Sequence, residues 1–305
     1  MKSIIKLLMI FMLALLIVFG GNYIIGIKGY ANISVSKAVN AGVYPGNYDA
    51  EEEKEINSEN GENEKIEKQE KVEEKINYVT MDKSEVKIPI LMYHSVSDDD
   101  PSNSLLVPIN KFEEQIKWLA EEGFTPMLLE DVVQAFETGK VPEKPVSITF
   151  DDGYADNYTE AYRILKNYNM KATFFIITDN IDVDSYFMNS DMLKEMKDHG
   201  MGIENHTSIH IEFTAISRED KASIISDGAK ALKDKAGVES KFLCYPVGRY
   251  DEETIEVAKE LGIKAAVTTE NGFATFSDGL HSLKRVRISP MDIEAFKSIF
   301  SDFIY

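Results

Sequence analysis

Two adjacent acidic residues and a pair of histidines have side chains and spacing that suit catalysis. Asp151 and Asp152 precede a glycine, and His206 and His210 are separated by three residues. One carboxylate and two imidazoles form a three-ligand site for a divalent metal and leave coordination positions open for water and substrate. The second carboxylate is then free to take a proton from water. This pattern predicts a metal-assisted hydrolase.

A parallel β-sheet is expected to position these residues, because short apolar runs alternate along the chain with amphipathic segments of helical period. The predicted strands are Ile88–Tyr93, Val146–Phe150, Ala172–Ile177, Gly202–Glu204, Lys241–Tyr245, Ala265–Thr268 and Lys284–Ile288. Phe112, Ile116, Leu119 and Ala120 lie on one face of a predicted helix. Further helices are predicted at Asn157–Tyr168, Asp191–His199, Ser217–Ala236, Asp251–Leu261 and Asp292–Phe303. Seven or eight such units predict an α/β fold, a small and incomplete (β/α) barrel.

The chemistry-bearing residues follow the predicted strands, and in a (β/α) barrel the active site lies at the C-terminal ends of the strands. Three of the five histidines, His94, His206 and His210, come just after strands. An Asp-Asp-Gly tripeptide is by itself most often a turn or a helix cap. Two histidines four positions apart also occur often by chance. The coincidence of all these residues at strand ends favours the metal site.

Composition narrows the classes of partner. The chain of 305 residues has 33 Lys and Arg against 52 Asp and Glu, a formal charge of −19. Nucleic acid and anionic lipid are therefore not expected as main partners, because they require a basic surface. The only cysteine, Cys244, excludes an intramolecular disulfide and lies in an apolar run, where we expect it to be buried. The sequence gives no indication of an oligomeric state.

Three segments are predicted along the chain. Residues 1–31 hold an uncharged stretch from Leu7 to Ile27 that is long enough to span a bilayer, with Lys2 and Lys6 before it. This segment is expected to be an uncleaved membrane anchor, with a cleaved signal segment and secretion as the alternative. Residues 32–86 are predicted as an acidic disordered linker. Residues 87–305 then form an extracellular catalytic domain.

The motifs resemble those of one family. The stretch 149–153 resembles the first signature of the polysaccharide deacetylase family, carbohydrate esterase family four, and 205–210 resembles its second. Residues 88–94, 245–250 and 265–289 resemble the first strand, the third motif and the closing segment of one branch of that family. The order of the motifs also matches.

This resemblance implies a distorted (β/α) barrel that hydrolyses acetyl groups from sugars. Asp151 would be the base that activates water. Asp152, His206 and His210 would hold the metal, most commonly zinc and sometimes cobalt or nickel. Backbone N–H groups within 246–248 would stabilise the oxyanion.

Other site residues follow from the resemblance and from departures from it. His94, Tyr245, Pro246 and Gly248 are candidate substrate-binding residues. The arginine that opens the third motif in many relatives, where it supports the base, is replaced here by Cys244, and Arg249 is the candidate to take its role. The late histidine that acts as general acid has one candidate, His281, which is equally well explained as a surface residue on a loop. His94 is a second candidate for a role at the site.

The expected reaction is N-deacetylation of an N-acetylglucosamine-containing polysaccharide of the cell envelope, such as peptidoglycan or an exopolysaccharide. The partners are then the acetylated polysaccharide and, through the N-terminal helix, the membrane. An O-acetyl esterase acting on xylan is an alternative that the same site could perform. A glycan-binding protein with a decayed active site is the alternative from another class. Acetate release with and without a chelator distinguishes them.

Overall fold

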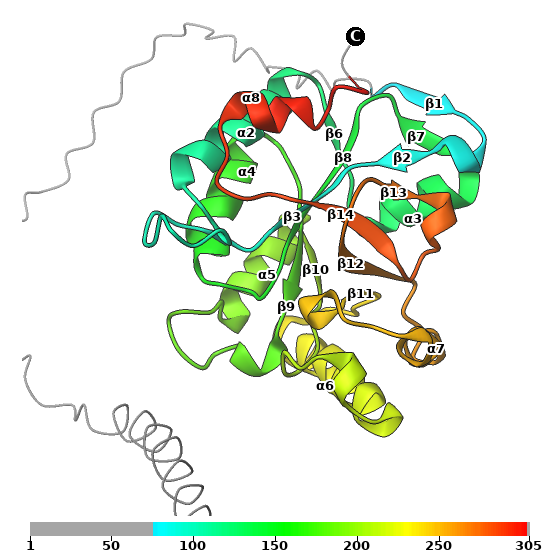
Figure 1. Ribbon diagram of the computed structural model, residues 1–305. Helices are drawn as coiled ribbons and strands as arrows, with labels where there is room; N and C mark the ends of the chain where they lie inside the picture. Colours follow the sequence, from blue (N-terminus) through cyan, green and yellow to red (C-terminus); the bar gives the residue numbers. More distant parts are fainter. Residues whose placement is uncertain (1–75, 304–305) are drawn as a thin grey trace, which may run out of the picture. The chain divides into compact units, whose positions relative to one another are not determined.

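A closed barrel of seven parallel strands forms the centre of the structure, a computed structural model that describes residues 76–303 (Figure 1). In order around the barrel, the strands are β3 (Ile90–Tyr93), β14 (Leu283–Arg287), β12 (Ala265–Asn271), β11 (Phe242–Cys244), β10 (Gly202–Asn205), β9 (Thr173–Ile176) and β8 (Pro145–Phe150). The predicted (β/α) barrel is confirmed, and each predicted strand is present. Its expected incompleteness is wrong, because β3 pairs with β8 from Ile90↔Ser147 to Tyr93↔Phe150 and closes the barrel.

The strands form long apolar runs because both of their faces are covered. All residues of β3 and of β8 are buried. Successive side chains point to opposite sides, so Phe174 packs with the outer helices while Phe175 packs with the barrel interior. The same alternation directs Thr149 and Asp151 inward. The barrel is irregular where β12 and β14 shift register between Val267 and Asn271.

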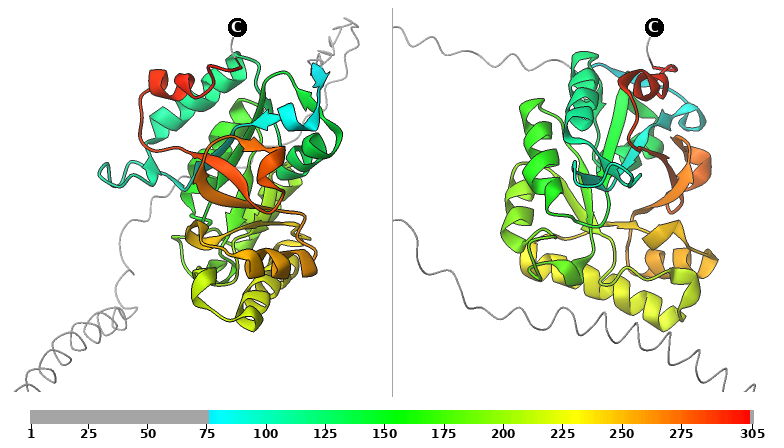
Figure 2. Two further views of the ribbon diagram at one scale, coloured as in Figure 1. Left: turned by 45° about the vertical axis from the view of Figure 1, so that its right-hand side comes forward. Right: turned by 60° about the vertical axis from the view of Figure 1, so that its left-hand side comes forward.

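Helices cover the outside of the barrel (Figures 1 and 2). They are α2 (Ile109–Glu121), α3 (Leu129–Thr138), α4 (Arg163–Asn167), α5 (Ser190–Asp198), α6 (Arg218–Ala236), α7 (Glu252–Glu260) and α8 (Ile293–Ser298). The predicted apolar face of α2 is confirmed, since Phe112, Ile116 and Leu119 are buried. The sequence prediction missed α3, and α8 is shorter than expected. The predicted helix at 157–168 divides into a π-helical segment, η2 (Asn157–Tyr162), and α4.

Strand β1 (Tyr78–Thr80) places the start of the folded domain before the predicted boundary at residue 87. It pairs with β7 (Lys140–Pro142), and Val86 is fully buried. The linker prediction is therefore wrong for 78–86, because a partner strand far away in sequence stabilises this segment.

The predicted membrane anchor and the linker up to residue 75 lie outside the described residues. Within 76–303, no helix combines the length and the apolar character that a membrane crossing needs.

Glu204 on β10 leads to a prediction about stability and pH. Its Oε2 accepts hydrogen bonds from the Ser240 hydroxyl and from the Lys241 and Phe242 N–H groups, at 2.8, 2.8 and 3.0 Å. Burial outweighs these donors and raises the pKa of Glu204 from 4.5 to about 7. The folded state therefore keeps a proton that the unfolded state loses, and stability falls by about 3 kcal/mol as pH rises from 4.5 to 7.

Glu204→Gln tests this because the amide stays neutral and can still accept from the backbone. We expect urea unfolding to show that the variant loses less stability than the wild type between pH 5 and pH 8. Equal pH dependence of the two proteins would contradict the prediction.

Candidate active site

Polar side chains converge where the strands end at the C-terminal mouth of the barrel. Asp151 and Asp152 follow β8, His206 and His210 follow β10, and His94 follows β3. The structure thus brings together the five residues on which the sequence argument depended most.

Asp152, His206 and His210 form a group that could hold one metal ion. The Asp152 Oδ1 lies 3.4 Å from the His206 Nε2 and 3.6 Å from the His210 Nε2, and one ligand atom from each residue lies within 4.8 Å of the others. Ligands about 2.1 Å from a tetrahedral zinc ion are roughly 3.4 Å apart, so these separations fit. Asp152 has a φ of 74°, which turns its carboxylate away from the direction that Asp151 takes.

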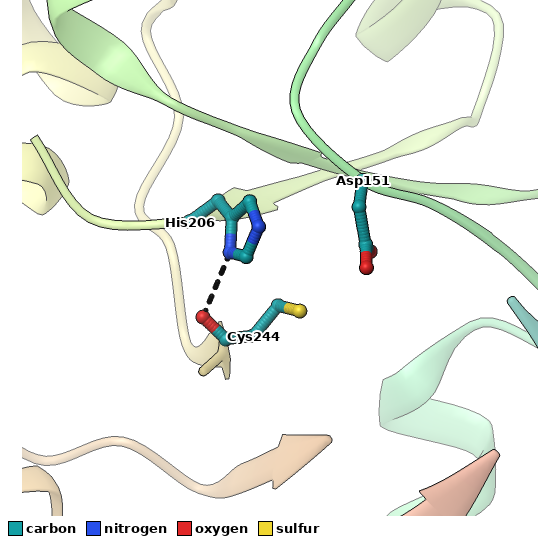
Figure 3. Close-up of side chains that lie close together, drawn as sticks. All are labelled: Asp151, His206 and Cys244. Carbon is teal, nitrogen blue, oxygen red and sulfur yellow. Dashed lines mark hydrogen bonds between the residues drawn. The ribbon is translucent and has the colours of Figure 1, made fainter. Parts of the chain in front are cut away.

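The backbone of Cys244 orients the His206 ring. The His206 Nδ1 lies 2.9 Å from the Cys244 carbonyl oxygen, the hydrogen bond drawn in Figure 3. This oxygen can only accept, so Nδ1 carries a proton, and Nε2, which faces Asp152, is the nitrogen available to a metal. Metal-ligating histidines are commonly fixed in this way by the hydrogen bond of their other nitrogen. Thr207 supports the turn between the two histidines by donating from Oγ1 to the Ile209 carbonyl, at 2.6 Å.

Arg285 on β14 holds the second carboxylate, that of Asp151. Its Nη1 and Nη2 donate to Asp151 Oδ1 and Oδ2 at 2.8 and 2.7 Å, in a bidentate pair. The guanidinium also donates to the Thr149 hydroxyl and to the Thr268 carbonyl, at 3.0 and 2.8 Å. Arg285 has no solvent exposure, and its charge is compensated by Asp151. These contacts fix the direction of the Asp151 carboxylate.

Electrostatics keep Asp151 ionised. Burial acts to raise the pKa of Asp151, but the Arg285 guanidinium outweighs it, with smaller help from His94 and His206, so this pKa lies well below its ordinary value. Arg249, the candidate for supporting the base, is exposed in a groove outside this pair. The assignment to Arg249 was wrong, because the supporting guanidinium comes from β14, which is separated from β8 only by β3.

Cys244 is buried, as expected, and lies close to Asp151 and His206 (Figure 3). Those three residues do not form a second metal site, because Arg285 already occupies the space between them. Its Nη2 lies 3.2 Å from the Cys244 Sγ and 2.7 Å from the Asp151 Oδ2. Burial also raises the pKa of the Cys244 thiol.

Of the two histidines considered for proton transfer, the structure brings His94 to the site. The His94 Nε2 lies 3.9 Å from the Asp151 Oδ2, and the His94 carbonyl accepts a hydrogen bond from the Asn157 side chain at 2.7 Å. His281 instead precedes β14, and its Nε2 lies 2.8 Å from the carbonyl of Ile263, which precedes β12. His281 is therefore at the N-terminal end of the barrel, away from the other candidates.

Comparison with known proteins agrees with this geometry. A family model described as polysaccharide deacetylase matches residues 138–266. The Bacillus subtilis protein YxkH, named for that family, is 42% identical over 67% of this chain and 72% of its own length. The chain belongs to the polysaccharide deacetylase family. A Staphylococcus aureus poly-β-1,6-N-acetyl-D-glucosamine N-deacetylase is 30% identical over 70% of this deacetylase and 78% of its own length.

Solved structures resemble this deacetylase over its barrel. The Streptococcus pyogenes deacetylase PplD, solved in complex with acetate, aligns with a TM-score of 0.68 and 34% identity over 70% of this chain and 98% of its own. BC0361, a polysaccharide deacetylase from Bacillus cereus, aligns with a TM-score of 0.64 and 29% identity over 71% and 69% of the two chains.

The loop after β11 of the deacetylase has a buried tyrosine and an unusual backbone conformation. The Tyr245 ring is fully buried and stacks on Tyr250, and its hydroxyl donates to the His281 carbonyl at 3.0 Å. The Tyr245 side chain is therefore not accessible to a substrate, and only the backbone of this candidate residue could contact one. Val247 has a φ of 50°, which is rare for a β-branched residue and is typical of strain held at functional sites. Gly248 is required beside it, because a Cβ there would lie 1.9 Å from the Thr269 hydroxyl.

A groove of about 670 Å³ opens beside this loop. It is lined by residues that follow β10 and β11 and by the last residues of β12, among them Glu212, Val247, Arg249 and Glu270. Glu212, one of its lining residues, is two residues from His210 in the chain. Its polar lining suits the hydroxyl groups of a sugar chain.

Proposed function

We propose that this deacetylase removes N-acetyl groups from an N-acetylglucosamine-containing polysaccharide of the cell envelope, such as peptidoglycan or an exopolysaccharide, with a divalent metal as cofactor. The observation that carries the proposal is the position of Asp151, which is ionised and lies beside the Asp152, His206 and His210 group without belonging to it. The Staphylococcus aureus relative supports an amide as the scissile bond, since its name specifies N-deacetylation.

Asp152, His206 and His210 would hold the metal. One carboxylate and two imidazoles suit zinc best, with cobalt and nickel as alternatives. A bound divalent ion supplies Lewis acidity, which lowers the pKa of water and polarises a carbonyl group. The solvent exposure of His210, a third for its side chain, leaves one side of the group open to a glycan.

The chain's own residues account for the proton transfers. Asp151 takes a proton from the attacking water, and Arg285 keeps its carboxylate in place during the step. His94 is the residue placed to give a proton to the leaving nitrogen, in preference to the distant His281. Burial lowers the pKa of His94 below its ordinary value, and the carboxylates of Asp151 and Asp152 offset this only in part.

The oxyanion is assigned to the backbone N–H of Val247. Pro246 has no N–H, and the N–H of Gly248 already donates to the Tyr245 carbonyl at 2.9 Å. Val247 has a strained left-handed backbone conformation. This conformation would orient its N–H group toward the negative charge that develops on the oxyanion.

Acetate release from defined glycans tests the proposal. We expect the full chain to release acetate from β-linked N-acetylglucosamine oligomers, to lose this activity with a chelator, and to regain it with zinc or cobalt. Acetylated xylan as the preferred substrate would instead support the O-acetyl esterase alternative. Binding of these glycans without any acetate release would support the decayed glycan-binding alternative.

Removal of a metal ligand gives a sharper prediction. His206→Ala deletes a buried ligand, so the metal affinity should fall more than about 100-fold and acetate release should fall with it. Metal content after dialysis, measured by mass spectrometry, checks this. His199→Ala is the matched control, because the His199 ring bonds to the helix carbonyl of Glu195 and His199 precedes β10, at the end of the barrel opposite the site. Full metal occupancy in His206→Ala would refute the ligand assignment.

We also propose that the catalytic domain acts on the outer side of the cell membrane. The uncharged stretch from Leu7 to Ile27, with lysines before it, supports an anchored chain with an extracellular domain. Fractionation of cells and protease treatment of intact cells test this location. Recovery of the full-length chain from the soluble cytoplasm would contradict it.

A further inference from the structure

An aromatic cluster adjoins the carboxylates of the site. Tyr154 follows Gly153 directly, and Tyr186 and Phe187 lie on the connection between β9 and α5. Tyr154 pairs with Phe187 in an isolated antiparallel bridge, and the Ala155 N–H donates to the Tyr186 carbonyl at 2.9 Å. These bonds hold the connection firmly against the loop that carries Asp151 and Asp152.

The three rings pack on one another in a fixed arrangement. Tyr154 and Phe187 are stacked, with centroids 5.6 Å apart and 20° between their planes. Tyr186 is nearly perpendicular to both, at 74° and 89°, with centroids 5.3 and 5.1 Å away. Tyr186 nevertheless remains 65% exposed. A large aromatic side chain held in place and open to solvent beside an active site is typical of a binding surface.

This cluster adjoins the site along the chain. Tyr154 lies two residues after Asp152, and its ring contacts Tyr186. A polysaccharide whose acetyl group reaches Asp152 must place its neighbouring sugar rings over the loops around the mouth of the barrel. One of those loops is the connection that carries Tyr186, and another borders the groove beside Val247.

We propose that Tyr186 is a stacking platform for the sugar ring next to the one that loses its acetyl group, and that it sets a preference for long chains over short substrates. This inference rests on the proposed function. The flat C–H face of a pyranose is apolar and its edge carries hydroxyls, which suits the face and the hydroxyl of a tyrosine.

A lipid surface is the competing partner for exposed apolar residues on a loop, because Val183 on the same connection is also 65% exposed. Charge argues against it. Asp182 and Asp184 flank Val183 and are exposed, so insertion would bring two carboxylates to the bilayer surface. Binding of a polysaccharide would not bring these carboxylates to a bilayer surface. The position of the polysaccharide is also already set by the catalytic residues.

The experiment compares Tyr186→Ala, Tyr186→Phe and the wild-type chain on N-acetylglucosamine hexamer and on a small aryl acetate. We expect Tyr186→Ala to raise KM for the hexamer about 5- to 10-fold, in line with the loss of one aromatic contact, and to leave aryl acetate hydrolysis unchanged. Tyr186→Phe should stay close to the wild type because it keeps the ring. Phe276→Ala is the control, since Phe276 is 50% exposed and precedes β14 at the other end of the barrel.

An unchanged KM for the hexamer in Tyr186→Ala overturns this inference and leaves the proposed function intact. Equal losses on both substrates also overturn it, because the ring would then support the site rather than bind a neighbouring sugar. Loss of binding to phosphatidylglycerol vesicles with an unchanged KM would assign the residue to a membrane instead. Absence of acetate release from any glycan by the wild type would refute both proposals.

Discussion

Asp151→Asn is expected to lower kcat for acetate release by about 10²- to 10⁴-fold, the range that a general base contributes. The amide cannot take a proton from water, while its shape and its position against Arg285 are nearly preserved. The metal should stay, because Asp151 does not belong to the group formed by Asp152, His206 and His210. Initial rates on N-acetylglucosamine oligomers, together with metal content, check both parts of the prediction.

Asp152→Asn and Asp234→Asn complete this test. Asp152→Asn should lose both metal and activity, whereas Asp151→Asn should lose activity alone. Asp234 lies on the exposed face of α6, and its substitution should change neither. If Asp151→Asn retains more than about a tenth of the wild-type rate, Asp151 is not the base.

The barrel was predictable because its strands are buried on both faces. A parallel strand covered on both sides has an uninterrupted apolar run, as in β8, and such runs are recognised without knowledge of their partners. The candidate metal group was predictable for a related reason. Parallel strands end at the same mouth, so Asp152 and His206, which follow β8 and β10, were expected at the same end of the barrel.

The sequence prediction did not identify Arg285 as the residue that orients the Asp151 carboxylate, because their pairing is a contact between residues far apart in sequence. Arg249 was chosen for its nearness in sequence to the third motif, but Arg285 lies on β14, which pairs with β3 rather than with β8. The sequence alone did not single out Arg285, because β14 reads Leu-Lys-Arg-Val-Arg and Arg285 is one of three cationic residues on it. Only the folded structure shows that Arg285 is the fully buried one and that it pairs with Asp151.

Two other errors have equally specific physical causes. His281 precedes a strand, and residues that precede strands lie at the end of the barrel opposite the site. Strand β1 was assigned to the linker because Tyr78–Thr80 is short and follows a highly charged stretch. Only its pairing with β7 stabilises it, and that pairing cannot be inferred from local composition.

Arg285→Met is expected to destabilise the fold by about 3–5 kcal/mol at neutral pH, since it leaves the Asp151 carboxylate buried without its cation. In the variant, burial would raise the pKa of Asp151 above its ordinary value of 3.8. In the wild type, the Arg285 guanidinium holds this pKa below that value. In the wild type, the pair stabilises the fold above pH 3.8, and this contribution is lost as the pH falls further. In the variant the pH dependence of stability has the opposite sign. Its stability falls as the pH rises above 3.8, because the buried carboxylate must then ionise. Urea unfolding at pH 4 and pH 7 measures the difference, which should be larger at pH 7.

The double variant Asp151→Asn with Arg285→Met separates the two roles of the pair. With both charges gone, stability should recover most of what Arg285→Met lost, because no unpaired buried charge remains. Activity should stay as low as in Asp151→Asn, since the base is absent. Arg285→Lys should be intermediate, because an ammonium keeps the charge but cannot make the bidentate pair or reach Thr149 and Thr268 together. A double variant no more stable than Arg285→Met would show that Arg285 acts by packing, and the base would then need another explanation for its fixed orientation.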